Sequence, residues 1–137
     1  IEAVRKALEI AREKGCRLAK ELVVGGAFHS PLMEDATHGL VEALDNAEIN
    51  DIEIPLYANV TGKPVQKSDE IRDLLKKQLL SPVMWEETMK NMVADNYDLY
   101  IEVGPGTVLQ GLLKRIDRNA ESGGIDRLSD LDRFQVE

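Results

Sequence analysis

Apolar residues recur at helical spacing in five stretches of the chain. Residues three and four positions apart lie on one face of an α-helix, so each stretch predicts a helix with one apolar side. The predicted helices cover residues 1–14, 31–47, 68–79, 82–94 and 107–116. The first of them begins at Ile1 without a capping residue or an initiator methionine, so we expect that this start is a cut within a longer sequence.

Strand patterns lie between these helices. Residues 52–60 alternate apolar and polar side chains, and Pro55 within them favours an edge strand or a strand start. Residues 16–24 end in an apolar run, and residues 99–103 form a short apolar stretch before a Gly-Pro-Gly turn. Residues 122–124, Ser-Gly-Gly, are predicted to be a loop. A strand, a glycine turn and a helix in succession indicate an α/β fold.

Serine precedes several of the predicted helices. Ser30 and Ser81 are each followed by proline, and this pair favours a helix start because the hydroxyl caps while the ring presets the first φ. Ser68 and Ser129 are predicted to cap the third helix and a last short turn that ends near Phe134. After the Gly-Pro-Gly turn, the start of the fifth helix either offers free N–H groups to a ligand or a neighbouring loop, or the turn only lets the helix and the strand pack closely.

Composition narrows the class of protein. The 137 residues are 43% apolar and 31% charged, which fits one modest globular domain. The net charge of −8 disfavours nucleic-acid binding. No apolar run approaches the ~20 residues of a membrane span, and no signal peptide is visible. The single cysteine, Cys16, excludes an internal disulfide and fits a reducing compartment, so we expect a cytoplasmic protein without a metal site.

His29 is the first candidate for chemistry. It lies on a short connection after Gly25 and Gly26, where an imidazole can serve as a general base or remain an inert loop side chain. Gln78 falls on the apolar stripe of the third helix, and its amide must be hydrogen-bonded there unless it reaches water at the margin of the stripe. The other histidine, His38, lies off its apolar stripe and is expected to be exposed without a role.

A nucleophile for His29 is not evident. No G-x-S-x-G motif occurs, and Ser30 is better placed as a helix cap. A cysteine enzyme that pairs Cys16 with His29 has no surrounding signature. The residues therefore supply a candidate base and no partner for it.

Four motifs occur in order along the chain: GAFHSPLM at 26–33, IPLYANVTGKPV at 54–65, QLLSPVMWEETM at 78–89 and YIEVGPGTVLQGLLKRI at 100–116. Together they resemble the C-terminal half of the malonyl-CoA:acyl carrier protein transacylase family, over nearly the whole chain. The resemblance implies transfer of malonyl from malonyl-CoA to the phosphopantetheine thiol of acyl carrier protein in fatty-acid synthesis. The transfer passes through a serine acyl-enzyme, and no permanently bound cofactor is expected.

The resemblance also assigns roles to residues. His29 matches the family's general acid and base, and Gln78 matches the residue whose main-chain carbonyl orients that histidine. Phe28 resembles the malonyl-selecting form of the motif, because a phenyl ring there would crowd the methyl group of methylmalonyl. The family's nucleophilic serine, on a GHSxGE elbow, its oxyanion-hole glutamine and its malonyl-binding arginine belong to an N-terminal half that these residues do not include.

The implied fold is a partial α/β-hydrolase-like large subdomain, residues 25–137, preceded by the last helix and strand of a ferredoxin-like small subdomain, residues 1–24. The expected partners are acyl carrier protein, malonyl-CoA and the N-terminal half of the same fold, and these residues alone are expected to be inactive. An alternative stays open: a non-catalytic module that binds a carrier protein or coenzyme A and reuses half of the transacylase fold.

Overall fold

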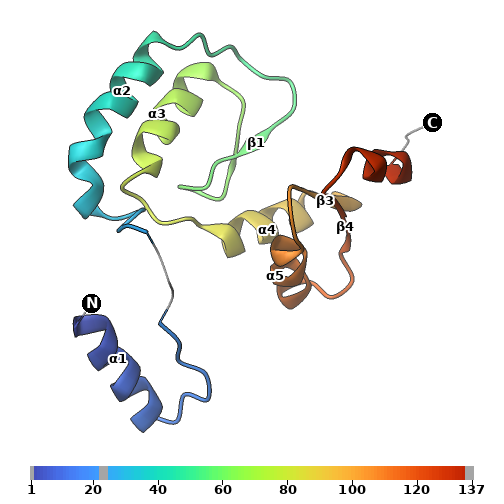
Figure 1. Ribbon diagram of the computed structural model, residues 1–137. Coiled ribbons are helices and arrows are strands. Elements are labelled where there is room, and N and C mark those ends of the chain that lie inside the picture. Colours follow the sequence, from blue (N-terminus) through green and yellow to red (C-terminus); the bar gives the residue numbers. More distant parts are fainter. Residues whose placement is uncertain (1, 22–24, 135–137) are drawn as a thin grey trace.

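The computed structural model describes residues 2–21 and 25–134 and has a mixed α/β architecture (Figure 1). In chain order the elements are α1 (Glu2–Glu13), η1 (Pro31–Ala36), α2 (Thr37–Asn46), β1 (Leu56–Tyr57), β2 (Pro64–Val65), α3 (Ser68–Gln78), α4 (Trp85–Ala94), β3 (Leu99–Val103), α5 (Val108–Ile116), β4 (Glu121–Ile125) and η2 (Leu128–Phe134). Here η marks a 3₁₀-helix. All five predicted helices have a counterpart, but the second, predicted over residues 31–47, is divided into the 3₁₀-helix η1 and the α-helix α2.

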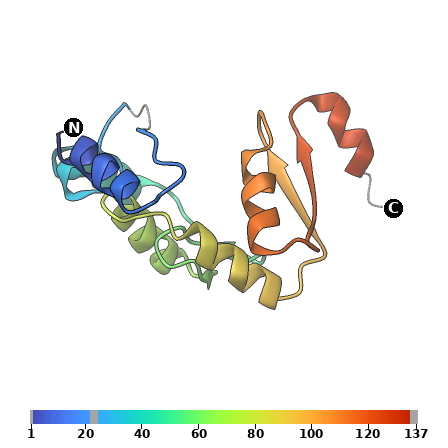
Figure 2. The same ribbon diagram turned by 90° about the horizontal axis from the view of Figure 1, so that it is seen from below.

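Apart from α1, the elements gather in two groups, each around its own apolar cluster (Figures 1 and 2). In the first, α2 packs on α3, and the hairpin β1–β2 lies beside α3 over a cluster of Ala58, Val65 and Ile71. In the second, α4 packs on α5, and α5 covers the sheet β3–β4. The centre of this second cluster is Met89, Leu113 and Ala120.

The caps only partly follow the prediction. Ser30 caps η1 as expected, with its side chain accepting from Leu32 N and proline following it. Ser68, however, is already helical, and the Asp51 carboxylate accepts from its N–H at 2.8 Å. The turn before η2 is closed in the same way, by the carboxylate of Asp130 instead of Ser129. A charged carboxylate is the stronger acceptor for helix-terminal N–H groups, which explains both replacements.

Two further boundaries differ from the pattern. The fourth helix begins at Trp85, not directly after the Ser81-Pro82 pair, so this pair does not open the helix. Residues 16–21 form no strand, and the apolar end of that predicted strand, residues 22–24, lies outside the described residues. Residues 16–21 are instead tied to α1: Arg12 donates to the carbonyl of Ala19 at 3.1 Å, and Arg5 pairs with Glu21 at 3.6 Å.

The predicted strand at 52–60 is reduced to the two residues of β1, which pair antiparallel with β2. A side chain takes over the carbonyls ahead of it, since Gln66 Nε2 donates to Glu53 O at 2.6 Å and to Ile52 O at 3.3 Å. Pro55 has no N–H with which to extend the ladder. The carbonyl groups of Ile52 and Glu53 are therefore hydrogen-bonded by the Gln66 side chain and not by a neighbouring strand.

The predicted loop at 122–124 is wrong: it lies within β4, which pairs parallel to β3 with Ile101 opposite Gly123. Neighbouring side chains occupy the space that a Cβ would take at both of its glycines. A Cβ on Gly123 would lie 2.7 Å from the Phe134 ring, and one on Gly124 would lie 2.8 Å from the Gln110 amide nitrogen. The turn-like composition thus reflects close packing on a strand.

Candidate active site

His29 lies in a strained turn that leads into η1. Phe28 and His29 are its middle residues, and the φ of His29 is +62°. A left-handed backbone costs a non-glycine residue about 1–2 kcal/mol, although histidine tolerates it better than most side chains. The main-chain N–H of His29 donates to Leu79 O at 3.0 Å, which holds the turn against the end of α3. Such strain is common where a side chain must be aimed for function.

The end of α3, which binds the main chain of His29, also binds its imidazole. Nδ1 of His29 lies 3.0 Å from the main-chain oxygen of Gln78. A carbonyl oxygen can only accept, so in this contact Nδ1 carries the proton and Nε2 of the neutral ring is the unprotonated nitrogen. His29 is exposed, so its ring is accessible to a reacting group from outside the described residues.

Gln78 is the last residue of α3 and is half-buried. Its side-chain amide lies 3.4 Å from the Ser81 carbonyl and 3.4 Å from Nδ1 of His29. A protonated Nδ1 cannot accept from that amide, so the main-chain contact decides the tautomer. The structure therefore brings together the two residues that the sequence singled out, His29 and Gln78, although they are 49 positions apart.

Phe28 is exposed and precedes His29 directly. Its ring lies against Gly26, where an added Cβ would be 3.2 Å from the ring edge. Glycine at this position therefore leaves the room in which the Phe28 ring rests.

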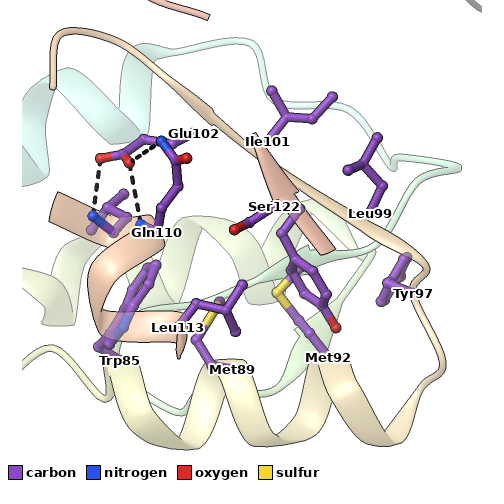
Figure 3. A pocket seen from close by; sticks show the side chains of 12 residues that line it. Trp85, Met89, Met92, Tyr97, Leu99, Ile101, Glu102, Gln110, Leu113 and Ser122 are labelled. Carbon is purple, nitrogen blue, oxygen red and sulfur yellow. Dashed lines mark hydrogen bonds between the residues drawn. The ribbon is translucent and has the colours of Figure 1, made fainter. Parts of the chain in front are cut away.

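Two N–H groups at the start of α5 already have an acceptor. Glu102 on β3 accepts from the N–H groups of Leu109 and Gln110 at 3.1 and 3.2 Å, and the Gln110 amide donates to it as well (Figure 3). The bond from Leu109 N–H contributes most to holding the pKa of Glu102 below its usual range. The predicted partner of these N–H groups, a ligand or a neighbouring loop, is wrong for Leu109 and Gln110, because a carboxylate on strand β3 is their acceptor.

Three cavities lie against the helices and strands of the two groups, and two of them include residues of the contacts just described. The first, about 180 Å³, is largely apolar and lies between α4, α5 and β3, with Trp85, Met89 and Leu113 in its wall (Figure 3). The second, about 110 Å³, is lined by β1 and α3 and includes Gln78 and Asn59. Asn59 also accepts from Met84 N at 2.7 Å, which joins the β1–β2 hairpin to the start of α4.

Asp51 is a polar residue that the sequence pattern did not identify. Its carboxylate binds Lys67 Nζ at 2.7 Å and the Ser68 N–H at 2.8 Å. These contacts, that with Lys67 first, lower the pKa of Asp51 to about 2. An acidic residue directly before an apolar position gives no sign of such a role, since its partner lies 17 positions later.

Across residues 2–21 and 25–134, no three His, Cys, Asp or Glu side chains are arranged to hold a metal ion. Within the same ranges, every helix is too short or too polar to cross a bilayer.

Comparison with known proteins identifies relatives along almost the whole chain. The family model described as "Acyl transferase domain" matches residues 1–128. The malonyl CoA-acyl carrier protein transacylase of Bacillus subtilis is 38% identical over 121 residues, which are 88% of this chain and 38% of that protein. The chain thus spans less than half the length of the relatives it matches.

Solved structures of malonyltransferases share the fold of this chain. An acyl carrier protein S-malonyltransferase from Vibrio cholerae superposes with a TM-score of 0.87 at 35% identity, over 97% of this chain and 44% of that one. A malonyl-transacylase solved in complex with its type II PKS acyl-carrier protein gives a TM-score of 0.87 at 32% identity, over 96% and 42%.

Proposed function

Because the chain belongs to the acyl transferase domain family, we propose that the protein containing it transfers malonyl from malonyl-CoA to the phosphopantetheine thiol of an acyl carrier protein. The names of the relatives support this substrate pair, and one of them was solved with its carrier protein. The observation that carries the proposal is the contact between His29 Nδ1 and Gln78 O at 3.0 Å, which leaves Nε2 free to act as a base.

The reaction runs in two halves, both served by His29. In the first, Nε2 takes the proton of a serine hydroxyl while the serine oxygen attacks the malonyl thioester carbonyl. The tetrahedral intermediate collapses, the C–S bond breaks, and the departing coenzyme A thiolate receives that proton. In the second half Nε2 takes the proton of the carrier thiol, which attacks the serine ester, and the proton returns to the serine oxygen. Assistance of this kind contributes about 10²–10⁴ in rate.

Gln78 and Phe28 assist the transfer, and no step of it uses a cofactor. The Gln78 carbonyl holds the imidazole in the Nδ1–H tautomer and stabilises the imidazolium that forms in each half. Phe28, which rests on Gly26, narrows the entrance beside His29 and selects malonyl over a methyl-branched acyl group. The nucleophilic serine comes from sequence outside these 137 residues.

The proposal includes the domain arrangement. Residues 1–24 complete a ferredoxin-like small subdomain, and residues 25–137 form the C-terminal part of an α/β-hydrolase-like large subdomain. Exposed apolar residues on one side of β3 support the proposal that another part of the domain covers this face. Leu99, Ile101 and Val103 are 43%, 38% and 79% exposed. Parallel sheets normally have both faces covered, so the N-terminal half of the domain packs there. The whole enzyme works in the cytoplasm.

Radiolabelled malonyl-CoA tests the proposal on two samples, the complete gene product and residues 1–137 alone. The complete protein is expected to form one covalent adduct per chain and to pass it to carrier protein. Residues 1–137 are expected to form none, because they lack the serine. An adduct on residues 1–137 would show that the nucleophile lies within them, and absence of transfer by the complete protein would refute the function.

A further inference from the structure

Ser30 holds both sides of the turn that carries His29. Its hydroxyl donates to Ala27 O at 2.7 Å, three positions back, and accepts from Leu32 N at 3.4 Å in the first turn of η1. The two middle residues of this turn are Phe28 and His29. One hydroxyl therefore closes the turn around the histidine and fixes the closed turn to the helix that follows.

The strain at His29 makes this closure necessary. A positive φ at the third residue of a turn is characteristic of type II turns, which favour glycine or asparagine there. The turn therefore needs other contacts to keep histidine in that conformation. Besides the ring contact with Gln78 O, two contacts hold the turn: the Ser30 hydroxyl bonds to Ala27 O and the His29 N–H bonds to Leu79 O. The bond to Leu79 O involves main-chain atoms alone, so the Ser30 hydroxyl is the side chain that closes the turn itself.

The ring position depends on the same turn. Relaxation of His29 to a negative φ would move the Cβ direction and take Nδ1 away from Gln78 O, whose contact fixes the tautomer. We propose that Ser30 is a positioning residue: its hydroxyl keeps His29 left-handed and thereby keeps Nε2 as the basic nitrogen. This inference rests on the proposed function of His29 as general base.

Ser30→Ala in the complete gene product tests it. A displacement of about 1 Å at a reacting group can cost up to ~10²-fold in rate, so we expect kcat for malonyl transfer to fall tenfold or more while KM for malonyl-CoA changes by less than about twofold. Ser30→Thr keeps the hydroxyl and is expected to restore most of kcat. Ser129→Ala, an exposed serine on η2 in the other group of elements, is the matched control and is expected to leave kcat unchanged (Figure 1).

A spectroscopic readout separates this inference from the function on which it rests. The ¹⁵N resonances of neutral His29, assigned by their loss in His29→Asn, are expected to show a protonated Nδ1 in the parent protein and a mixed tautomer in Ser30→Ala. An unchanged tautomer and unchanged kcat in Ser30→Ala would overturn the positioning role even if His29 is essential. A changed tautomer together with full activity of His29→Asn would overturn the proposed function while the positioning effect remains.

Discussion

Nδ1 of His29 and the main-chain oxygen of Gln78 lie 3.0 Å apart, and the main-chain N–H of His29 donates to the next residue, Leu79, at 3.0 Å. The histidine is thus bound twice to the C-terminal end of α3, once through its ring and once through its backbone. The helix end sets the ring orientation, and the proposed acyl transfer depends on that orientation.

The main-chain nature of this acceptor leads to a prediction for Gln78→Ala. The substitution removes the amide and its 3.4 Å contact with Ser81 O but leaves the carbonyl that faces His29. We expect malonyl transfer to fall by less than about tenfold, since general-base help of ~10²–10⁴ is retained. The free energy of unfolding should drop by no more than about 1 kcal/mol. Steady-state kinetics and urea denaturation measure both, and a loss of a thousandfold or more would make the amide the functional group.

Gly62, between β1 and β2, tests how the hairpin packs against α4. Its φ is +67°, and a Cβ there would lie 2.9 Å from the main-chain nitrogen of Thr88. Both the left-handed conformation and the contact with α4 disfavour a side chain, so Gly62→Ala should lower the free energy of unfolding by about 2 kcal/mol or more.

Gly111→Ala is the matched control. Gly111 is exposed within α5, and an added Cβ meets no atom within 4 Å. Alanine at such a helical site should raise the free energy of unfolding by about 0.5–1 kcal/mol. Equal effects of the two substitutions in chemical denaturation would contradict the packing of the hairpin turn against α4.

The ion pair and hydrogen bond of Asp51 should stabilise the folded protein at neutral pH and lose this effect in acid. Its contacts with Lys67 and the Ser68 N–H lower its pKa from 3.8 to about 2. The unfolded chain therefore binds the proton first, and the stabilisation is complete above the unfolded pKa and is lost as pH falls from about 4 toward 2. Asp51→Asn should lower Tm at neutral pH, and the difference from the parent protein should shrink over this interval. A difference in Tm that is constant from pH 6 to about pH 2 would exclude this role.

Local pattern was sufficient for α3, α5 and β3, which has the predicted bounds 99–103, and not for β1 and β4. The stripes of α3 and α5 are encoded by neighbours three and four positions apart, so their bounds could be predicted closely. The conformation of β4 depends on β3 and on the Phe134 ring, and its Ser-Gly-Gly sequence resembles a loop when considered alone. The strand at 52–60 was shortened by Gln66, a residue outside the pattern.

The same distinction applies to the candidate site. Periodicity placed Gln78 on an inward face and turn chemistry marked His29, but neither could pair residues 49 positions apart. The resemblance to transacylases supplied the pairing and the correct atom, the main-chain oxygen. No residue-type pattern can identify a backbone acceptor, because every residue has one. Glu102 and Asp51 were not identified from the sequence either, because their partners are main-chain N–H groups, which every residue except proline has.

The role of His29 as general base is tested most directly by single-turnover malonyl transfer by His29→Asn in the complete gene product. Asparagine tolerates the left-handed backbone at this position, so the turn is kept while the base is removed. We expect acylation by radiolabelled malonyl-CoA, measured by rapid quench, to slow by about 10²–10⁴ with an unchanged Tm. Acylation within about threefold of the parent rate would show that His29 is not the general base.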